Sequence, residues 1–143
     1  MADNRVALGS PPVLTLDITR RLIPDGDNFY DRNMLAVNLT VVAGRFRGFI
    51  ETQFRADELA RFRDMFRTMY QHLRGEWHQE FLGSGLDLRM KGDGLGHFEM
   101  VCIADDEGGT GNELTFGIYF DQTEIPEMLA SLDEVVANFP VRD

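Results

Sequence analysis

The spacing of apolar residues changes near residue 55, and this change constrains the fold more than any other feature of the sequence. Between residues 34 and 54 apolar and polar side chains alternate, which is the pattern of strands with one buried face. Beyond residue 55 the apolar residues recur at intervals of three and four, as on one stripe of a helix: Leu59, Phe62, Phe66, Met69 and Leu73. The chain therefore combines an amphipathic helix with half-buried strands.

The same two periods predict seven strands and two helices along the chain. The strands are expected at residues 13–23, 34–42, 46–54, 77–82, 86–91, 97–104 and 113–121. The helices are expected to begin near Asp57 and at Thr123, which caps the second, and to end before Gly75 and Pro140. The stripe of the second helix is Ile125, Leu129, Leu132, Val136 and Phe139.

Short turn sequences join most of the strands. PDGD (24–27), AGR (43–45) and GDGLG (92–96) contain residues typical of tight turns, and strands joined by such turns pair antiparallel. We therefore predict the α+β class: a largely antiparallel, twisted sheet of about seven strands with two amphipathic helices packed on it. One domain is expected over residues 13–143, after a flexible tail over residues 1–12.

The acidic residues are concentrated in the last third of the chain. The net charge is −10. Residues 1–92 contain 13 basic and 12 acidic residues, whereas residues 93–143 contain 1 basic and 12 acidic residues. This acidic block, residues 93–143, argues against binding to nucleic acid or to an anionic membrane. It is compatible with a basic partner, or with a role only in keeping the protein soluble.

Several features favour a cytoplasmic protein. No apolar run is long enough to span a membrane, and the N-terminus lacks the apolar core of a signal peptide. The single cysteine, Cys102, excludes an internal disulfide. Because it lies in an apolar strand, we expect a buried and unreactive thiol.

The sequence contains no recognisable pattern of a catalytic, metal or cofactor site. The glycines of GDGLG precede a strand, whereas a nucleotide-binding loop precedes a helix. Asp105, Asp106 and Glu107 lack the spacing of a calcium-binding loop, and no serine lies in a nucleophile elbow. The histidines lack the spacing of a helical metal site: His72, His78 and His97. We therefore predict a protein that is not an enzyme and needs no cofactor.

Residues 29–33, FYDRN, place aromatic, acidic, basic and amide side chains next to one another before a predicted strand. One interpretation is a structural corner, in which Asp31 accepts hydrogen bonds and Asn33 closes a turn. Another is a patch that contacts a partner through Tyr30, Asp31 and Arg32. An active site is the weakest of the three interpretations, because no catalytic pattern accompanies the segment.

The segment and the strand after it, FYDRNMLAVNLTVVAGRFRG, resemble a known family. The helix ELARFRDMF and the strands LDLRM and HFEMVCIA follow in the same order, so the resemblance covers roughly residues 14–137. In these features the chain is similar to the WapI-type immunity proteins, which protect a bacterium against a contact-delivered polymorphic toxin. The matching residues are Tyr30, Asp31, Arg32, Asn33, Leu35, Val37, Phe46 and Gly48.

The resemblance implies a cytoplasmic immunity protein that binds and neutralises a cognate toxin domain, of which a nuclease is one candidate. The acidic block predicts that this partner is basic. Glycines 108, 109 and 111 predict that the acidic loop is mobile and exposed, and the acids fall into two patches, one at each end of the last strand. The expected partner-binding residues are Asp105, Asp106, Glu107, Asp121, Glu124, Glu127, Tyr30, Asp31 and Arg32.

Two other classes of function predict different surfaces. A small-ligand-binding domain, or an enzyme with dispersed site residues, requires a deep pocket formed by His72, His78, His97, Asp31 and Arg32. A structural or oligomerisation domain requires a large exposed apolar patch on a sheet face or an edge strand.

Overall fold

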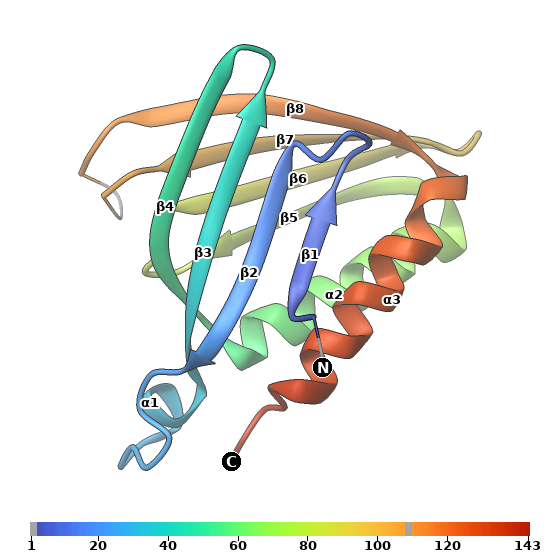
Figure 1. Cartoon of the computed structure of the whole chain (residues 1–143). Coiled ribbons are helices and arrows are strands. Elements are labelled where there is room, and N and C mark those ends of the chain that lie inside the picture. Colours follow the sequence, from blue (N-terminus) through green and yellow to red (C-terminus); the bar gives the residue numbers. More distant parts are fainter. Residues whose placement is uncertain (1–2, 108–109) are drawn as a thin grey trace.

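The computed structural model describes residues 3–107 and 110–143. Eight strands form two antiparallel sheets, and the strands of one sheet run across those of the other (Figure 1). The first sheet contains β1 (Arg5–Leu8), β2 (Leu14–Arg21), β3 (Met34–Ala43) and β4 (Phe46–Arg55), in that order. The second contains β5 (Arg74–Phe81), β6 (Leu86–Asp93), β7 (His97–Asp105) and β8 (Glu113–Asp121). The helices are α1 (Phe29–Asn33), α2 (Ala56–His72) and α3 (Ile125–Asn138), with the 3₁₀ turn η1 (Gln122–Glu124) before α3.

The predicted α+β class and the antiparallel pairing are confirmed, but the strands form two sheets instead of one. The cause is α2, which lies between β4 and β5 in the chain. Its 17 residues span about 25 Å at 1.5 Å per residue. This length carries β5 away from β4, so that β5 begins a new sheet.

The described residues contain eight strands and not seven, because residues Arg5–Leu8 form β1. The prediction that this part of the chain belongs to a flexible tail is wrong. Val6 and Leu8 are buried, all four residues pair with β2, and Arg5 is ion-paired to Asp17 at 2.7 Å. Four residues of alternation are too short a pattern to be recognised before the pairing strand is known.

One hydrophobic core joins the inner faces of both sheets with α2 and α3. In the first predicted stripe Leu59, Phe62, Phe66 and Met69 are buried. The last residue of the stripe, Leu73, is partly buried. It follows the end of α2 and has a left-handed backbone conformation. In the second stripe Ile125, Leu129 and Leu132 are buried, and Val136 and Phe139 are partly buried. Aromatic rings connect the layers, because Phe54 of β4 stacks on Phe81 of β5 and Phe62 of α2 stacks on Trp77 of β5.

Glu58 fixes the start of α2 against the second sheet. Its carboxylate accepts hydrogen bonds from the backbone N–H of Arg55, at 2.9 Å, and from that of Leu82, at 2.8 Å. The Glu58 carbonyl also accepts a hydrogen bond from the amide of the buried Gln79. Burial raises the pKa of Glu58, and the two backbone N–H groups oppose that shift. The contacts hold the turn after β5 beside the end of β4, which fixes one wall of the site described below.

Candidate functional site

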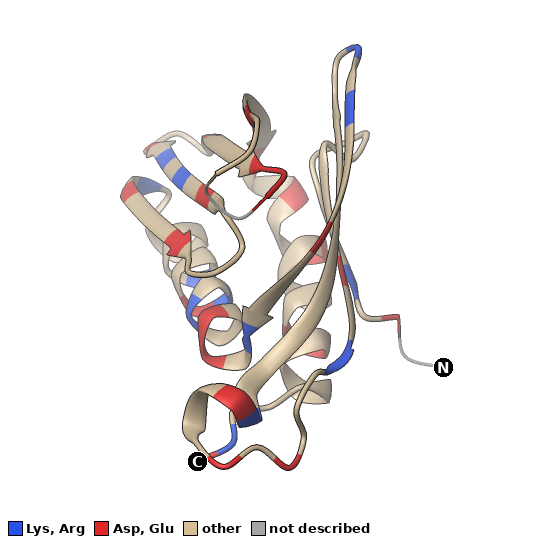
Figure 2. Cartoon of the chain, turned by 90° about the vertical axis from the view of Figure 1, so that its left-hand side faces the viewer, with Lys and Arg blue, Asp and Glu red and all other residues tan. Residues whose placement is uncertain are grey.

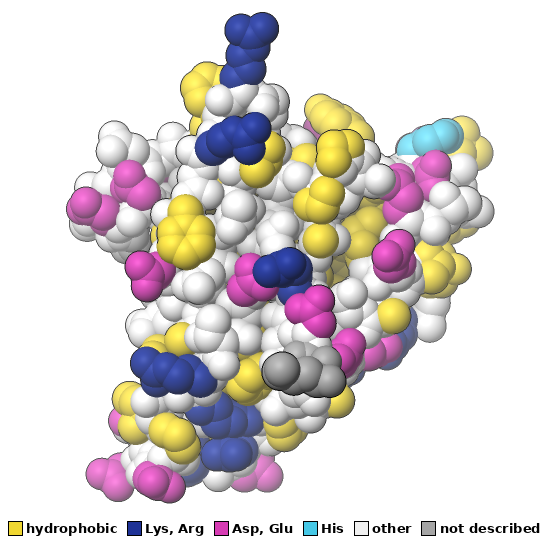
Figure 3. All heavy atoms as spheres, in the orientation of Figure 1, with side chains coloured by type: hydrophobic (Ala, Val, Ile, Leu, Met, Phe, Trp, Pro, Cys, Tyr) yellow, Lys and Arg dark blue, Asp and Glu magenta, His cyan; other side chains and the backbone are white. Residues whose placement is uncertain are grey.

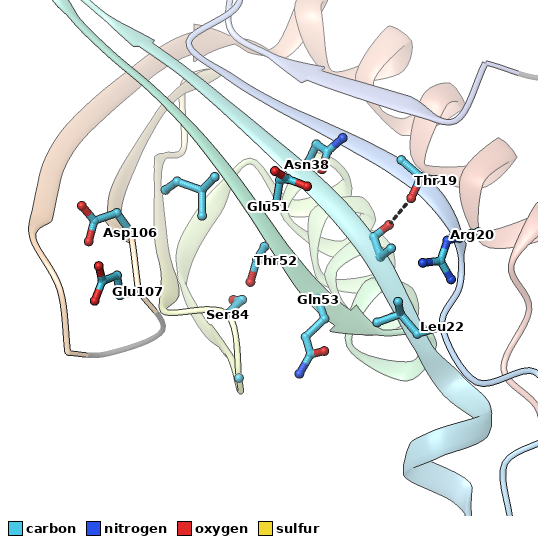
Figure 4. Close-up of a pocket in the computed structure, with 13 residues that line it drawn as sticks. Thr19, Arg20, Leu22, Asn38, Glu51, Thr52, Gln53, Ser84, Asp106 and Glu107 are labelled. Carbon is cyan, nitrogen blue, oxygen red and sulfur yellow. Dashed lines mark hydrogen bonds between the residues drawn. The ribbon is translucent and has the colours of Figure 1, made fainter.

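An open cleft of about 600 Å³ lies along β4 and faces the turns at one end of the second sheet. The first sheet contributes side chains from β2, β3 and β4, and the opposite wall comes from the β5–β6 turn and the β7–β8 connection (Figure 4). Its polar lining includes Thr19, Arg20, Asn38, Glu51, Thr52, Gln53, Ser84, Asp106 and Glu107. Its volume exceeds those of four other cavities among the described residues, which range from about 310 to about 440 Å³.

Strand register and one bulge position the side chains of the first wall. Asn38 pairs with Glu51, so both side chains project from the outer face of the sheet. The register between β2 and β3 shifts between Ile18 and Arg20. The hydroxyl of Thr19 donates a hydrogen bond to the Ala36 carbonyl at 3.2 Å.

The opposite wall is held by local hydrogen bonds. Ser84 is buried in the β5–β6 turn, donates to the Phe81 carbonyl at 2.9 Å and accepts from the Leu86 N–H at 3.1 Å. In the β7–β8 connection Asp106 accepts hydrogen bonds from the backbone and the side chain of Asn112. Glu107 and Asp106 are exposed, and both line the cleft.

Asp105, the first acid of that connection, points inward. It is 2% exposed and accepts hydrogen bonds from the N–H groups of Glu107, at 2.8 Å, and Gly111, at 3.3 Å. Of the three loop acids, Asp106 and Glu107 are therefore the two that a partner can reach. Gly108 and Gly109, which were expected to make the loop mobile, lie outside the described residues.

The second group of predicted acids lies at the other end of β8 from the cleft. Asp121 accepts hydrogen bonds from the N–H and the hydroxyl of Thr123, and Glu124 accepts one from the Asp121 N–H at 2.9 Å. The bonds from Thr123 lower the pKa of Asp121. Asp121 thus caps the turn before α3, a role that was expected of Thr123. Glu127 is exposed one turn further on.

The FYDRN segment forms the one-turn helix α1, a corner between β2 and β3. Asn28 caps it by accepting a hydrogen bond from the Asp31 N–H at 2.9 Å. Asn33 is fully buried and exchanges two hydrogen bonds with the backbone of Arg142, at 2.7 and 2.8 Å. The segment therefore attaches the C-terminal residues to the first sheet.

Part of that corner remains accessible. Tyr30 is 59% exposed, and the Arg55 guanidinium lies 5.1 Å from the centre of its ring. Asp31 accepts a hydrogen bond from the Asn28 amide at 3.2 Å. Arg32 donates to the Gly26 carbonyl at 3.3 Å, so its side chain closes the loop before α1.

The residues expected for a small-ligand pocket are not brought together. His72 lies at the end of α2, His78 on the outer face of β5 and His97 at the start of β7, while Asp31 and Arg32 lie in α1. His78 and His97 contact Asp87 and Asp93, each at 2.8 Å. Within residues 3–107 and 110–143 no group of three or more His, Cys, Asp or Glu side chains could hold a metal ion.

Cys102 is buried as predicted. Burial raises the pKa of its thiol to about 12, and the charge of Asp87 adds to the shift. The thiol is therefore protonated at neutral pH and is a poor nucleophile. In the part of the chain that the structure describes, no helix is both long and apolar enough to cross a membrane.

The outer-face residues of the cleft were not found from the sequence. Asn38, Glu51 and Gln53 occupy the polar positions of alternating strands, and such positions have the same pattern whether they face bulk water or a second wall. The mixed carboxylate, amide and hydroxyl lining of an open cleft suits hydrogen bonding to an extended polymer more than enclosure of a small molecule.

Comparison with known proteins agrees with the resemblance found in the sequence. A search of curated proteins found no similar sequence. The model of the immunity protein WapI-like family matches residues 8–140, from the end of β1 to beyond the end of α3. The match includes strands β2 to β8, the α1 corner and both walls of the cleft, and so the chain belongs to the WapI-like immunity protein family.

Proposed function

We propose that this protein neutralises a cognate bacterial toxin by binding to it directly in the cytoplasm. The observation that carries the proposal is the family match over residues 8–140. Inhibition by contact requires no catalytic group and no cofactor, in agreement with the protonated, buried thiol of Cys102 and the separated histidines.

Charge supports a basic partner. Asp106 and Glu107 are exposed on one wall of the cleft, and Glu51 is exposed on the other. A toxin domain that acts on nucleic acid carries a basic surface for its substrate, and an acidic inhibitor can cover such a surface. A nuclease is therefore the proposed class of toxin, and the cleft around Asp106 and Glu107 is the proposed docking site.

Two further groups of residues are proposed as secondary contacts. The acids Asp121, Glu124 and Glu127 surround the entry to α3, away from the cleft. Tyr30, Asp31 and Arg32 lie on α1, where Tyr30 offers an exposed ring. Aromatic and arginine side chains contribute strongly to many protein interfaces, which favours α1 as part of a larger contact.

The test is protection in cells. A toxin domain encoded immediately upstream of this gene is expressed with and without this protein, and colony formation is counted. Protection by this protein, and none by an immunity protein from an unrelated toxin locus, is the expected result. Equal killing in both cultures, with both proteins detected in the lysate, would show that this function is not the correct one.

A further inference from the structure

The edge of β4 differs from the other three sheet edges. β1 is in contact with α3, β5 is in contact with α2, and the contact of α2 with β4, which it directly follows in the chain, is less extensive. Residues 9–13 lie beside Gly117 to Tyr119 of β8. β4 pairs with β3 through ten consecutive residues without a bulge, contains no proline, and has no second strand among the described residues. A long, regular edge strand that lacks a bulge, a proline and a covering helix or loop is a template for pairing with another strand.

The register shows which backbone groups of β4 face outward. Val42 donates its N–H to Val13, and Met34 accepts from Leu22, so the even-numbered residues of β3 bond toward β2. The odd-numbered residues of β3 therefore bond toward β4, where their partners are even-numbered, from Phe46 to Phe54. The N–H and C=O groups that point away from the sheet belong to Arg47, Phe49, Glu51 and Gln53.

Two cavities continue one another along this edge. The cleft described above follows β4 from Ile50 to Gln53, and a second cavity of about 370 Å³ follows it from Phe46 to Ile50. Both include Asp106 in their opposite wall. The resulting groove borders eight residues of β4, which corresponds to about 26 Å of extended chain at 3.3 Å per residue. It is long enough for one more strand.

The side chains along the groove indicate the chemistry of the strand that fits. Carboxylates occur on both sides: Glu51 on β4, and Asp106, Glu107 and Glu113 opposite. Figure 2, which views the molecule from the β4 side, shows acidic segments on the first sheet and around the β7–β8 connection. Toward the tip of the β3–β4 hairpin, hydrophobic and basic side chains project together (Figure 3). Phe46 and Phe49 are 66% and 63% exposed there.

We propose that the β4 edge binds an extended segment of the cognate toxin as a ninth strand. The bound segment has basic side chains toward Glu51, Asp106 and Glu107, and apolar ones toward Phe46 and Phe49. The backbone of Arg47, Phe49, Glu51 and Gln53 provides the hydrogen bonds. This inference rests on the proposed function, and it adds the mode of binding and the chemistry of the bound segment.

A second copy of this chain fits the groove less well. Two antiparallel β4 edges would bring the acidic walls of both copies together, and the net charge of each chain is −10. Repulsion between like charges opposes that pairing and favours a basic segment.

The test compares two substitutions at one position. Glu51→Pro removes an outward N–H and leaves the bonds to β3 intact, because residue 51 does not bond toward β3. Glu51→Gln keeps the N–H and removes only the charge. Affinity for the inactivated upstream toxin domain is measured by calorimetry, and folding by circular dichroism. We expect the affinity of the proline variant to be lower than that of the glutamine variant by a factor of at least about ten.

Hydrogen exchange of the unmodified protein gives an independent readout. The amides of Arg47, Phe49, Glu51 and Gln53 are expected to exchange freely alone and to be protected in the complex. Tight binding by a folded Glu51→Pro variant, or unchanged exchange at these amides, overturns the strand pairing and leaves the proposed function intact. If the wild-type protein binds no upstream toxin domain, both fail. Dimers that protect the same amides without toxin would identify a second copy as the occupant and also overturn the inference.

Discussion

At the scale of single residues, Asn33 shows how one buried amide joins distant parts of the chain. Its side chain donates to the carbonyls of Phe29 and Arg142 and accepts from the Arg142 N–H. Asn33→Ala should lower the free energy of unfolding by about 2–3 kcal/mol, because three hydrogen bonds and their buried partners are lost. Denaturant titration measures this loss.

Asn38→Ala is the matched control for Asn33→Ala. Asn38 lies on the next strand but projects into the open cleft, and no hydrogen bond of its side chain to another described residue is found. This substitution should change stability by less than about 0.5 kcal/mol. Equal effects of the two alanines would show that the contacts of Asn33 with residue 142 contribute nothing to stability.

At the scale of elements, α2 organises the core through Phe66. The ring is fully buried between Phe62 of the same helix and Phe120 of β8, with ring centres 5.8 and 5.9 Å away. Phe66→Ala should cost about 3–5 kcal/mol of unfolding free energy. Phe46→Ala, on the exposed hairpin, should cost less than about 1 kcal/mol and serves as the control. A loss below about 1 kcal/mol for Phe66→Ala would mean that this helix face is not part of the core.

The elements differ in how far the sequence predicts them. The stripe containing Phe62 and Phe66 identifies α2 because burial of a helix face imposes a period that can be read over 17 residues. The division into two sheets depends on how α2 is placed in space, which is set by contacts such as that between Glu58, in its first turn, and Leu82. The polar residues of the cleft become neighbours only after that division. The sequence therefore predicts the core better than the site.

At the scale of the whole molecule, the asymmetric charge divides into patches at the two ends of β8. One contains Asp106 and Glu107 beside the groove, and the other contains Glu124 and Glu127 near α3. Each pair can be reversed to lysine with the same change in net charge, so that a difference between the two variants reports on position and not on total charge.

The association rate with the inactivated toxin domain should distinguish the two patches. Asp106→Lys with Glu107→Lys should slow association on the order of tenfold at low salt, because steering toward the docking site is lost. Added salt should reduce the difference from the wild type, since the Debye length falls to about 8 Å at 0.15 M ionic strength. Glu124→Lys with Glu127→Lys should have a smaller effect. Stopped-flow fluorescence measures both rates, and a larger effect of the α3 pair would place the docking site at the opposite end of β8.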